Sequence, residues 1–112
     1  MATPPPVTDT LARFVAETDS SAISETALGQ AKMHLLDTMG AGLAAVSTPV
    51  AAIAFDYCKR VGHSQEASIW GTTDGASSPM AAFTNGLLAH ALDFDDWDAY
   101  LRAGHPSSVI TA

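Results

Sequence analysis

One apolar stripe in residues 28–43 constrains the fold of this chain more than any other feature. Its members recur three or four residues apart: Leu28, Ala31, Leu35, Leu36, Met39 and Leu43. This spacing places them on one face of an α-helix and does not fit the two-residue period of a strand. Ser24 precedes the stripe and can cap the helix, although Ala27 supplies only half of a capping box. We therefore expect a helix of several turns.

Gly40 and Gly42 interrupt this predicted helix near its end. Each glycine costs a helix roughly 1 kcal/mol relative to alanine. A helix tolerates that cost where another element must approach its backbone closely. The two glycines therefore predict a close crossing by a second helix.

Three further helices are expected. The first begins at a cap on Thr8 or Thr10, ends near Thr18 and packs on the core through Leu11, Phe14 and Val15. In the second, Pro49 occupies the first turn and Gly62 follows the end at about Val61. Its apolar residues at four-residue spacing are Ile53, Tyr57 and Val61.

The third of these helices is expected from Pro79 to about Asp93. It should turn Met80, Phe83, Leu87, His90 and Ala91 toward the interior. Between residues 62 and 79 the sequence predicts a brief extended segment, Ala67–Gly71, and then a loop rich in glycine, serine and threonine to Ser78. The expected fold class is all-α.

The domain organisation follows from length and composition. A chain of 112 residues bounds one domain or part of one. We expect a flexible proline-rich leader at residues 1–7 and one continuous helical unit at residues 8–112. With 47% hydrophobic and 15% charged residues, the chain is apolar for its size, so part of its surface should meet further chain or a partner.

The net charge of the chain and its lack of targeting patterns limit its possible partners and its location in the cell. The net charge of -7 repels phosphate backbones and anionic lipids, which argues against nucleic acid and membrane partners. The apolar run Met39–Phe55 is interrupted by Ser47, Thr48 and Pro49, so buried helices are favoured over a membrane span. The single cysteine, Cys58, is expected in the core, as is Trp70. No secretory or transit pattern opens the chain, and the predicted location is cytoplasmic.

The segment His90–Asp98 is rich in side chains that can take part in catalysis. It holds four carboxylates, at positions 93, 95, 96 and 98, directly after an apolar helix. Carboxylates this close repel one another unless cations, hydrogen bonds or a metal compensate. On a helix His90 and Asp93 would share a face, where the imidazole could orient the carboxylate. The competing interpretation is a helix end that continues as a solvated acidic loop.

A second candidate follows at Gly104–Ile110. Here His105 precedes a predicted helix start with Ser107 or Ser108 as N-cap. Backbone N–H groups at a helix start attract carboxylates, so His105 and this start could form part of an anion pocket. A surface loop histidine is the simpler alternative.

Four segments resemble the N-terminal part of MmgE/PrpD proteins, in the order found in that family. They are LLDTMGAGLAA (35–45), SIWG (68–71), AAFTNGLLAHALDFDD (81–96) and GHPSSVI (104–110). The resemblance covers the chain from about Leu11 onward, and the pairing of HALDFDD with HPSS is its most specific feature. It implies the start of a large helical domain, which the family joins to a smaller α+β lid domain.

The resemblance also implies a function. Members are lyases or isomerases that act on citrate-like polycarboxylates, such as 2-methylcitrate dehydratase and cis-aconitate decarboxylase. They are commonly homodimers with a cofactor-free pocket between the two domains. We expect no metal in the site. The matching positions make Asp93 and His105 the candidate catalytic residues, with Trp97 and Ser107 as candidate substrate contacts. Trp97 replaces a common threonine, and the connection from Trp97 to Gly104 is more similar to dehydratase-type members.

These residues suit proton transfer at carbon. Histidine as a residue type exchanges protons near neutral pH, and Asp93 could act as a base or orient a neighbour. Neutralising the substrate carboxylates requires basic residues, which the family supplies from later in its sequence. The basic residues Lys32, Lys59, Arg60 and Arg102 are expected to be solvated, and His34 and His63 have no evident partner. By itself the chain is therefore expected to be inactive.

Other interpretations fit parts of the sequence. Asp93–Asp96 fits the D-x-D-D acid motif of class II terpene cyclases, but only 7% of residues are aromatic. The acids lack the glycine and glutamate positions of an EF-hand, whereas a mixed metal site of His105 and two aspartates is geometrically open. The main alternative is a non-catalytic helical module that dimerises or joins a longer homologue. Because residues 110–112 directly follow a helix start, we expect the natural polypeptide to continue.

Overall fold

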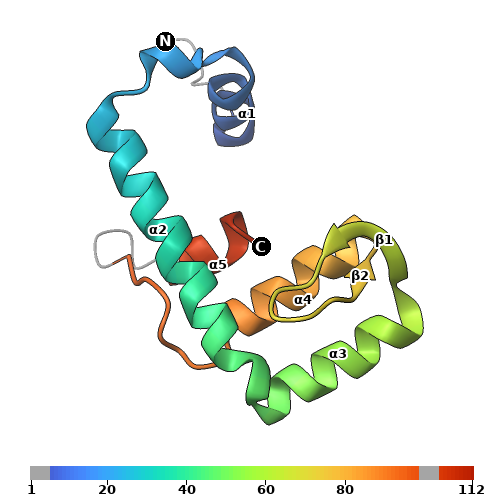
Figure 1. Cartoon of the computed structure of the whole chain (residues 1–112). Helices are drawn as coiled ribbons and strands as arrows, with labels where there is room; N and C mark the ends of the chain where they lie inside the picture. Colours follow the sequence, from blue (N-terminus) through green and yellow to red (C-terminus); the bar gives the residue numbers. More distant parts are fainter. Residues whose placement is uncertain (1–5, 99–103) are drawn as a thin grey trace. The chain divides into compact units, whose positions relative to one another are not determined.

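A computed structural model describes residues 6–98 and 104–112 of the chain (Figure 1). Among these residues helices dominate, and the all-α prediction is confirmed with the addition of one small two-stranded sheet. The elements in chain order are α1 (Val7–Glu17), η1 (Ser20–Ala22), α2 (Glu25–Ala44), η2 (Ala45–Ser47), α3 (Pro49–Val61), β1 (His63–Ser68), β2 (Gly75–Ala76), α4 (Ser78–His90) and α5 (Pro106–Ile110). The chain forms two compact units, residues 1–31 and 32–112.

The first unit contains α1, η1 and the start of α2. Pro6 is the N-cap of α1, and the Thr10 hydroxyl inside the helix donates to the Pro6 carbonyl at 3.2 Å, so the predicted threonine cap is wrong. The expected leader at residues 1–7 lies mostly outside the described residues. Within this unit the apolar stripe of α1 is not buried. The expected packing of this stripe on the core stays a prediction.

The predicted helix starts and ends around α2 and α3 are confirmed. Ser24 Oγ accepts the Ala27 N–H at 3.2 Å where α2 begins. Pro49 is the first residue of α3, Thr48 is its N-cap, and Gly62 is its C-cap. No single described helix is long and apolar enough to cross a membrane. Residues 25–47 and 49–61 reach the necessary length and apolarity only when taken together, and the two helices meet at a bend of 90°.

The structure differs from the prediction at residues 62–78, where it contains a small sheet. The extended segment begins at His63 and ends at Ser68, and the predicted loop contains β2, which pairs antiparallel with β1. Gly71 turns the chain with a positive φ of 73°. A Cβ on Gly75 would lie 2.6 Å from the Ser64 carbonyl oxygen, so only glycine permits this strand approach.

Small side chains form the core of the second unit. Helices α3 and α4 lie side by side with the sheet against α4 (Figure 1). One buried cluster contains Cys58, Ile69, Ala76 and Ala81, and the other contains Ala45, Ala51 and Leu88. Because so many of these residues are alanines, the helices can approach closely, and the larger apolar residues of α3 (Ile53, Tyr57, Val61) remain exposed.

The predicted interior face of α4 is wrong. Its buried residues are Ala81, Thr84, Asn85, Leu88 and Ala89, whereas Phe83 is 50% exposed. Apolar residues occupy most of the circumference of this helix, so periodicity alone does not single out one face. The buried face combines two alanines, which permit close contact, with Leu88, which fills the space between the helices.

The close approach predicted at the two glycines occurs at one of them. A Cβ on Gly42 would lie 2.7 Å from Trp70 Cε3 and 3.6 Å from the Ala89 nitrogen, whereas Gly40 faces open space. Cys58 is buried, as expected, and Trp70 packs against the second cluster. The Asn85 side chain accepts the Trp70 N–H at 3.0 Å and donates to the Ser68 carbonyl at 3.2 Å, which ties α4 to the chain around the sheet.

Candidate functional site

The backbone leaves the helical conformation directly after His90. Helix α4 ends there instead of continuing to Asp93, and Asp93 has a positive φ of 51°. Its N–H donates to the His90 carbonyl at 3.0 Å, which closes a tight turn. The expected pairing of His90 with Asp93 along one helix face is therefore wrong. Aspartate tolerates this left-handed conformation better than most residues.

This turn places Asp95 at the centre of a group of two histidines and two aspartates. We call His90, Asp93, Asp95 and His105 the Asp95 cluster. Asp95 Oδ1 lies 3.0 Å from His90 Nδ1 and 3.2 Å from His105 Nδ1, and its side chain has no solvent exposure. Its second oxygen, Oδ2, is buried without a hydrogen-bond partner among the described residues.

His105 joins the two aspartates of the cluster. Its Nε2 lies 3.4 Å from Asp93 Oδ1, and the Asp93 side chain is 79% exposed. The His105 ring packs against the His90 ring at a centroid distance of 4.5 Å and meets the Trp97 ring edge-on at 5.5 Å. The structure thus brings together the two predicted catalytic residues and the predicted substrate contact Trp97.

The electrostatics of the cluster favour an ionised Asp95. Burial is the largest single influence and opposes ionisation, but the hydrogen bond from His90, a backbone hydrogen bond and the charges of both histidines outweigh it. Together they lower the pKa of Asp95 below its ordinary value. A buried, ionised carboxylate therefore faces both imidazoles.

Asp96 holds α5 in place beside the cluster. Its Oδ1 accepts the Ser107 N–H at 3.1 Å, its Oδ2 accepts the Ser107 hydroxyl at 2.7 Å, and His34 Nδ1 lies 3.7 Å from Oδ2. His34 thus has a partner that the sequence did not reveal. The predicted caps Ser107 and Ser108 are wrong, because α5 begins at Pro106 with His105 as N-cap.

The predicted substrate contacts Trp97 and Ser107 line one open groove. Its volume is about 630 Å³, and its other lining residues are His34, Asp96, Asp98, Pro106 and Ile110. Within this groove the Ser107 N–H already binds Asp96, so the helix start is occupied by an internal carboxylate. The substrate roles of Trp97 and Ser107 stay predictions.

The geometry of the Asp95 cluster differs from that of a tetrahedral zinc site. The four donor atoms lie within 4.8 Å of one another, whereas donors around one zinc ion are roughly 3.4 Å apart at bond lengths of about 2.1 Å. His105 faces Asp95 with Nδ1 and Asp93 with Nε2, and two nitrogens of one ring cannot bind the same ion. A zinc ion bound by all four residues would therefore require the cluster to rearrange.

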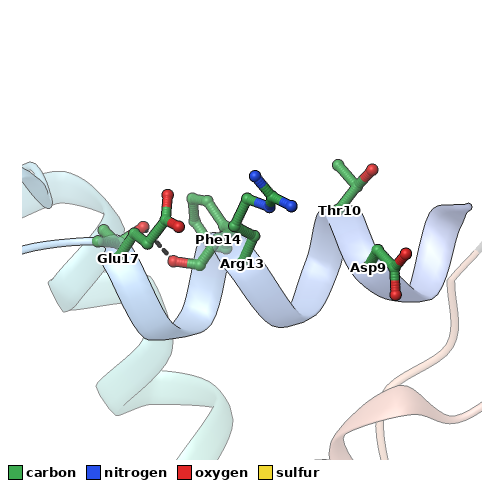
Figure 2. Close-up of a pocket in the computed structure, with 6 residues that line it drawn as sticks. Asp9, Thr10, Arg13, Phe14 and Glu17 are labelled. Atoms are coloured by element: carbon green, nitrogen blue, oxygen red, sulfur yellow. Dashed lines mark hydrogen bonds between the residues drawn. The ribbon is translucent and has the colours of Figure 1, made fainter. Parts of the chain in front are cut away.

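No lysine or arginine among the described residues forms an ion pair with the Asp95 cluster. Lys59 binds Asp74 at 2.9 Å and Arg60 binds Asp56 at 3.1 Å, both on exposed side chains, and Lys32 is exposed too, as predicted. Arg102 lies outside the described residues. Arg13 belongs to a separate surface hollow along α1 (Figure 2), lined by Asp9, Thr10, Arg13, Phe14, Glu17 and Thr18. That hollow contains none of the predicted site residues.

The chain belongs to the MmgE/PrpD family, because the sequence profile of the MmgE/PrpD N-terminal domain matches residues 9–112. Similar curated proteins are cis-aconitate decarboxylases. The Homo sapiens enzyme is 35% identical over 89 residues, which cover 79% of this chain and 18% of that protein. The Mus musculus enzyme is 29% identical over 105 residues, which cover 93% of this chain and 21% of that protein. No solved structure matches the chain significantly.

The chain therefore spans about a fifth of the length of these relatives. Sequence reasoning selected Asp93, Trp97, His105 and Ser107 but did not recognise Asp95 as the buried centre. The crowding of carboxylates indicated a cluster, yet four similar side chains gave no sign of which one would be enclosed. The turn at Asp93 places Asp95, and not its neighbours, between the two histidines.

Proposed function

We propose that this chain is the N-terminal part of a cofactor-independent lyase that dehydrates or decarboxylates small citrate-like polycarboxylates. The observation that carries the proposal is the Asp95 cluster, in which Asp93 and His105 lie 3.4 Å apart in a chain of this family. An imidazole held between carboxylates is suited to moving a proton at a substrate carbon. The names of the similar decarboxylases support this substrate class.

By itself the 112-residue chain is expected to be inactive. Two or three substrate carboxylates require nearby cations, and the basic residues Lys59 and Arg60 are engaged with Asp74 and Asp56. Further parts of a longer polypeptide would supply the cations and the lid, and a homodimer in the cytoplasm is the expected assembly.

Turnover measurements test both parts of the proposal. The 112-residue chain and the natural polypeptide from its source cell are assayed with cis-aconitate and with 2-methylcitrate. We expect turnover of one substrate by the natural polypeptide and none by the short chain. Appreciable turnover by the short chain would contradict the proposed inactivity, and no turnover by a natural polypeptide that extends beyond Ala112 would contradict the proposed function.

A second candidate function is a non-catalytic helical module that dimerises or joins a longer homologue. The exposed apolar residues of α3 favour it, with Ile53 71% and Val61 57% exposed. If the natural polypeptide ends at Ala112, this function replaces the lyase. Sedimentation of the purified chain, alone and with a longer homologue, then distinguishes self-association from a mixed complex.

A further inference from the structure

We propose that Asp95 is a positioning residue for His105. It holds the Nδ1 side of the ring and thereby directs Nε2 toward Asp93 and the reacting atoms of the substrate. This inference rests on the proposed lyase function and adds to it a residue that neither the sequence pattern nor the comparisons assign. Asp95 would act through His105 without contacting the substrate.

Burial distinguishes Asp95 from Asp93. The Asp95 side chain is fully enclosed, whereas that of Asp93 is 79% exposed. The two nitrogens of His105 therefore have different surroundings: Nδ1 faces an enclosed carboxylate at 3.2 Å, and Nε2 faces an exposed one at 3.4 Å. We therefore place the substrate on the Nε2 side of the ring, beside the exposed Asp93 carboxylate.

The hydrogen-bonding capacity of the groups determines the proton positions. An ionised carboxylate accepts hydrogen bonds and cannot donate them. His105 Nδ1 is buried without a hydrogen-bond partner, and Asp95 Oδ1 is the acceptor within reach, so a small ring rotation completes an Nδ1–H to Oδ1 bond. A neutral His105 would then carry its proton on Nδ1 and keep the Nε2 lone pair free.

His90 restrains Asp95 from the other side. Its Nδ1 lies 3.0 Å from the same oxygen, and its ring packs on the His105 ring. When Nε2 takes a proton from a substrate carbon, the Nδ1–H bond to Asp95 remains and the enclosed carboxylate stabilises the positive ring. When Nε2 returns the proton, the ring goes back to the same neutral tautomer.

The tautomer of His105 can be measured by long-range ¹H–¹⁵N NMR of the ¹⁵N-histidine-labelled chain, at a pH where the ring is neutral. We expect a protonated Nδ1 and an unprotonated Nε2 in the wild type. In Asp95→Asn the population should shift toward protonated Nε2, whereas Asp74→Asn, which alters a carboxylate paired with Lys59, should leave His105 unchanged. A wild-type His105 protonated mainly on Nε2 would overturn the proposal even if the variant failed to fold.

Activity of the natural polypeptide provides a second readout. Asp95→Asn should lower kcat by at least about tenfold, leave KM nearly unchanged and alter the pH profile, because the base is misdirected while binding persists. Asp95→Glu should restore part of the loss. A change in KM alone would overturn the positioning role. If no polycarboxylate is turned over, the proposed function fails, while the NMR result still decides whether Asp95 sets the tautomer.

Discussion

The apolar core of the second unit and the Asp95 cluster both enclose their central side chains. The core surrounds them with apolar groups, whereas the cluster surrounds a carboxylate with imidazoles. In the core, Ala51 and Leu88 are fully buried and meet other apolar groups. In the cluster, the enclosed Asp95 side chain meets two imidazoles. Apolar packing contributes stability in proportion to the area buried, whereas an enclosed ion pair contributes little net stability and mainly fixes geometry. We therefore expect substitutions in the core to affect folding most and substitutions in the cluster to affect chemistry most.

Leu88→Ala should give the largest loss of stability. Among the fully buried residues that the structure describes, Leu88 has the largest side chain, and its truncation leaves a cavity that should cost about 2 to 5 kcal/mol. Its neighbour Leu87, which is 36% exposed, provides the matched control, and Leu87→Ala should cost clearly less. Urea unfolding measures both. Equal losses would mean that the buried face of α4 is assigned incorrectly.

Substitutions at the two glycines of α2 should have opposite effects. Gly42→Ala introduces a Cβ that would meet Trp70 at 2.7 Å, and this overpacking should cost about 1 to 3 kcal/mol. Gly40→Ala faces open space and should stabilise the helix by about 0.5 to 1 kcal/mol. Thermal unfolding of the two variants compares them directly. A stabilising Gly42→Ala would contradict the close approach.

Asp95→Asn should reduce the free energy of unfolding by a smaller amount, about 1 to 2 kcal/mol at neutral pH. Because the pKa of Asp95 is lowered in the folded chain, its ionised form stabilises the fold above the ordinary value of 3.8. That contribution disappears as the pH falls from there through the lowered pKa. The difference between wild type and variant should therefore shrink in acid, as urea unfolding at several pH values would reveal. A difference that stays constant down to acid pH would argue against an ionised Asp95.

Ser107→Ala should have the smallest effect, about 1 kcal/mol or less, confined to α5. The substitution removes the hydroxyl that donates to Asp96 at 2.7 Å but keeps the backbone N–H bond. Hydrogen exchange should become faster in residues 106–110, while α3 keeps its protection. The exposed neighbour substitution Val109→Ala should leave exchange unchanged. Faster exchange throughout the chain would show that Asp96 supports more than α5.

Local signals predicted the ends of helices well. A helix starts or ends through the backbone and side chain of the residue at that position, so the neighbouring sequence suffices to predict it. This is the case at Ser24, Pro49 and Gly62. The buried face of α4 could not be read in this way, because apolar residues surround the helix and the face depends on what packs against it. The two-residue strand β2 is likewise defined by its partner β1.

In the candidate site, too, some features could be predicted from the sequence and others depend on the folded structure. Family resemblance selected Asp93 and His105, and the structure brings them to 3.4 Å. The contact between His34 and Asp96 joins residues far apart in the sequence. The enclosure of Asp95 depends on the turn at Asp93 and on the return of the chain that brings His105 to it. No local pattern of residues indicates such contacts.

The central claim, that the Asp95 cluster belongs to a lyase active site, is tested most directly by kcat/KM for cis-aconitate and 2-methylcitrate in the natural polypeptide with His105→Gln. General acid–base catalysis contributes roughly 10² to 10⁴ in rate, so a loss of at least about 100-fold is expected. His63→Gln, on the exposed start of β1, should retain wild-type turnover. Wild-type turnover by His105→Gln would contradict the account.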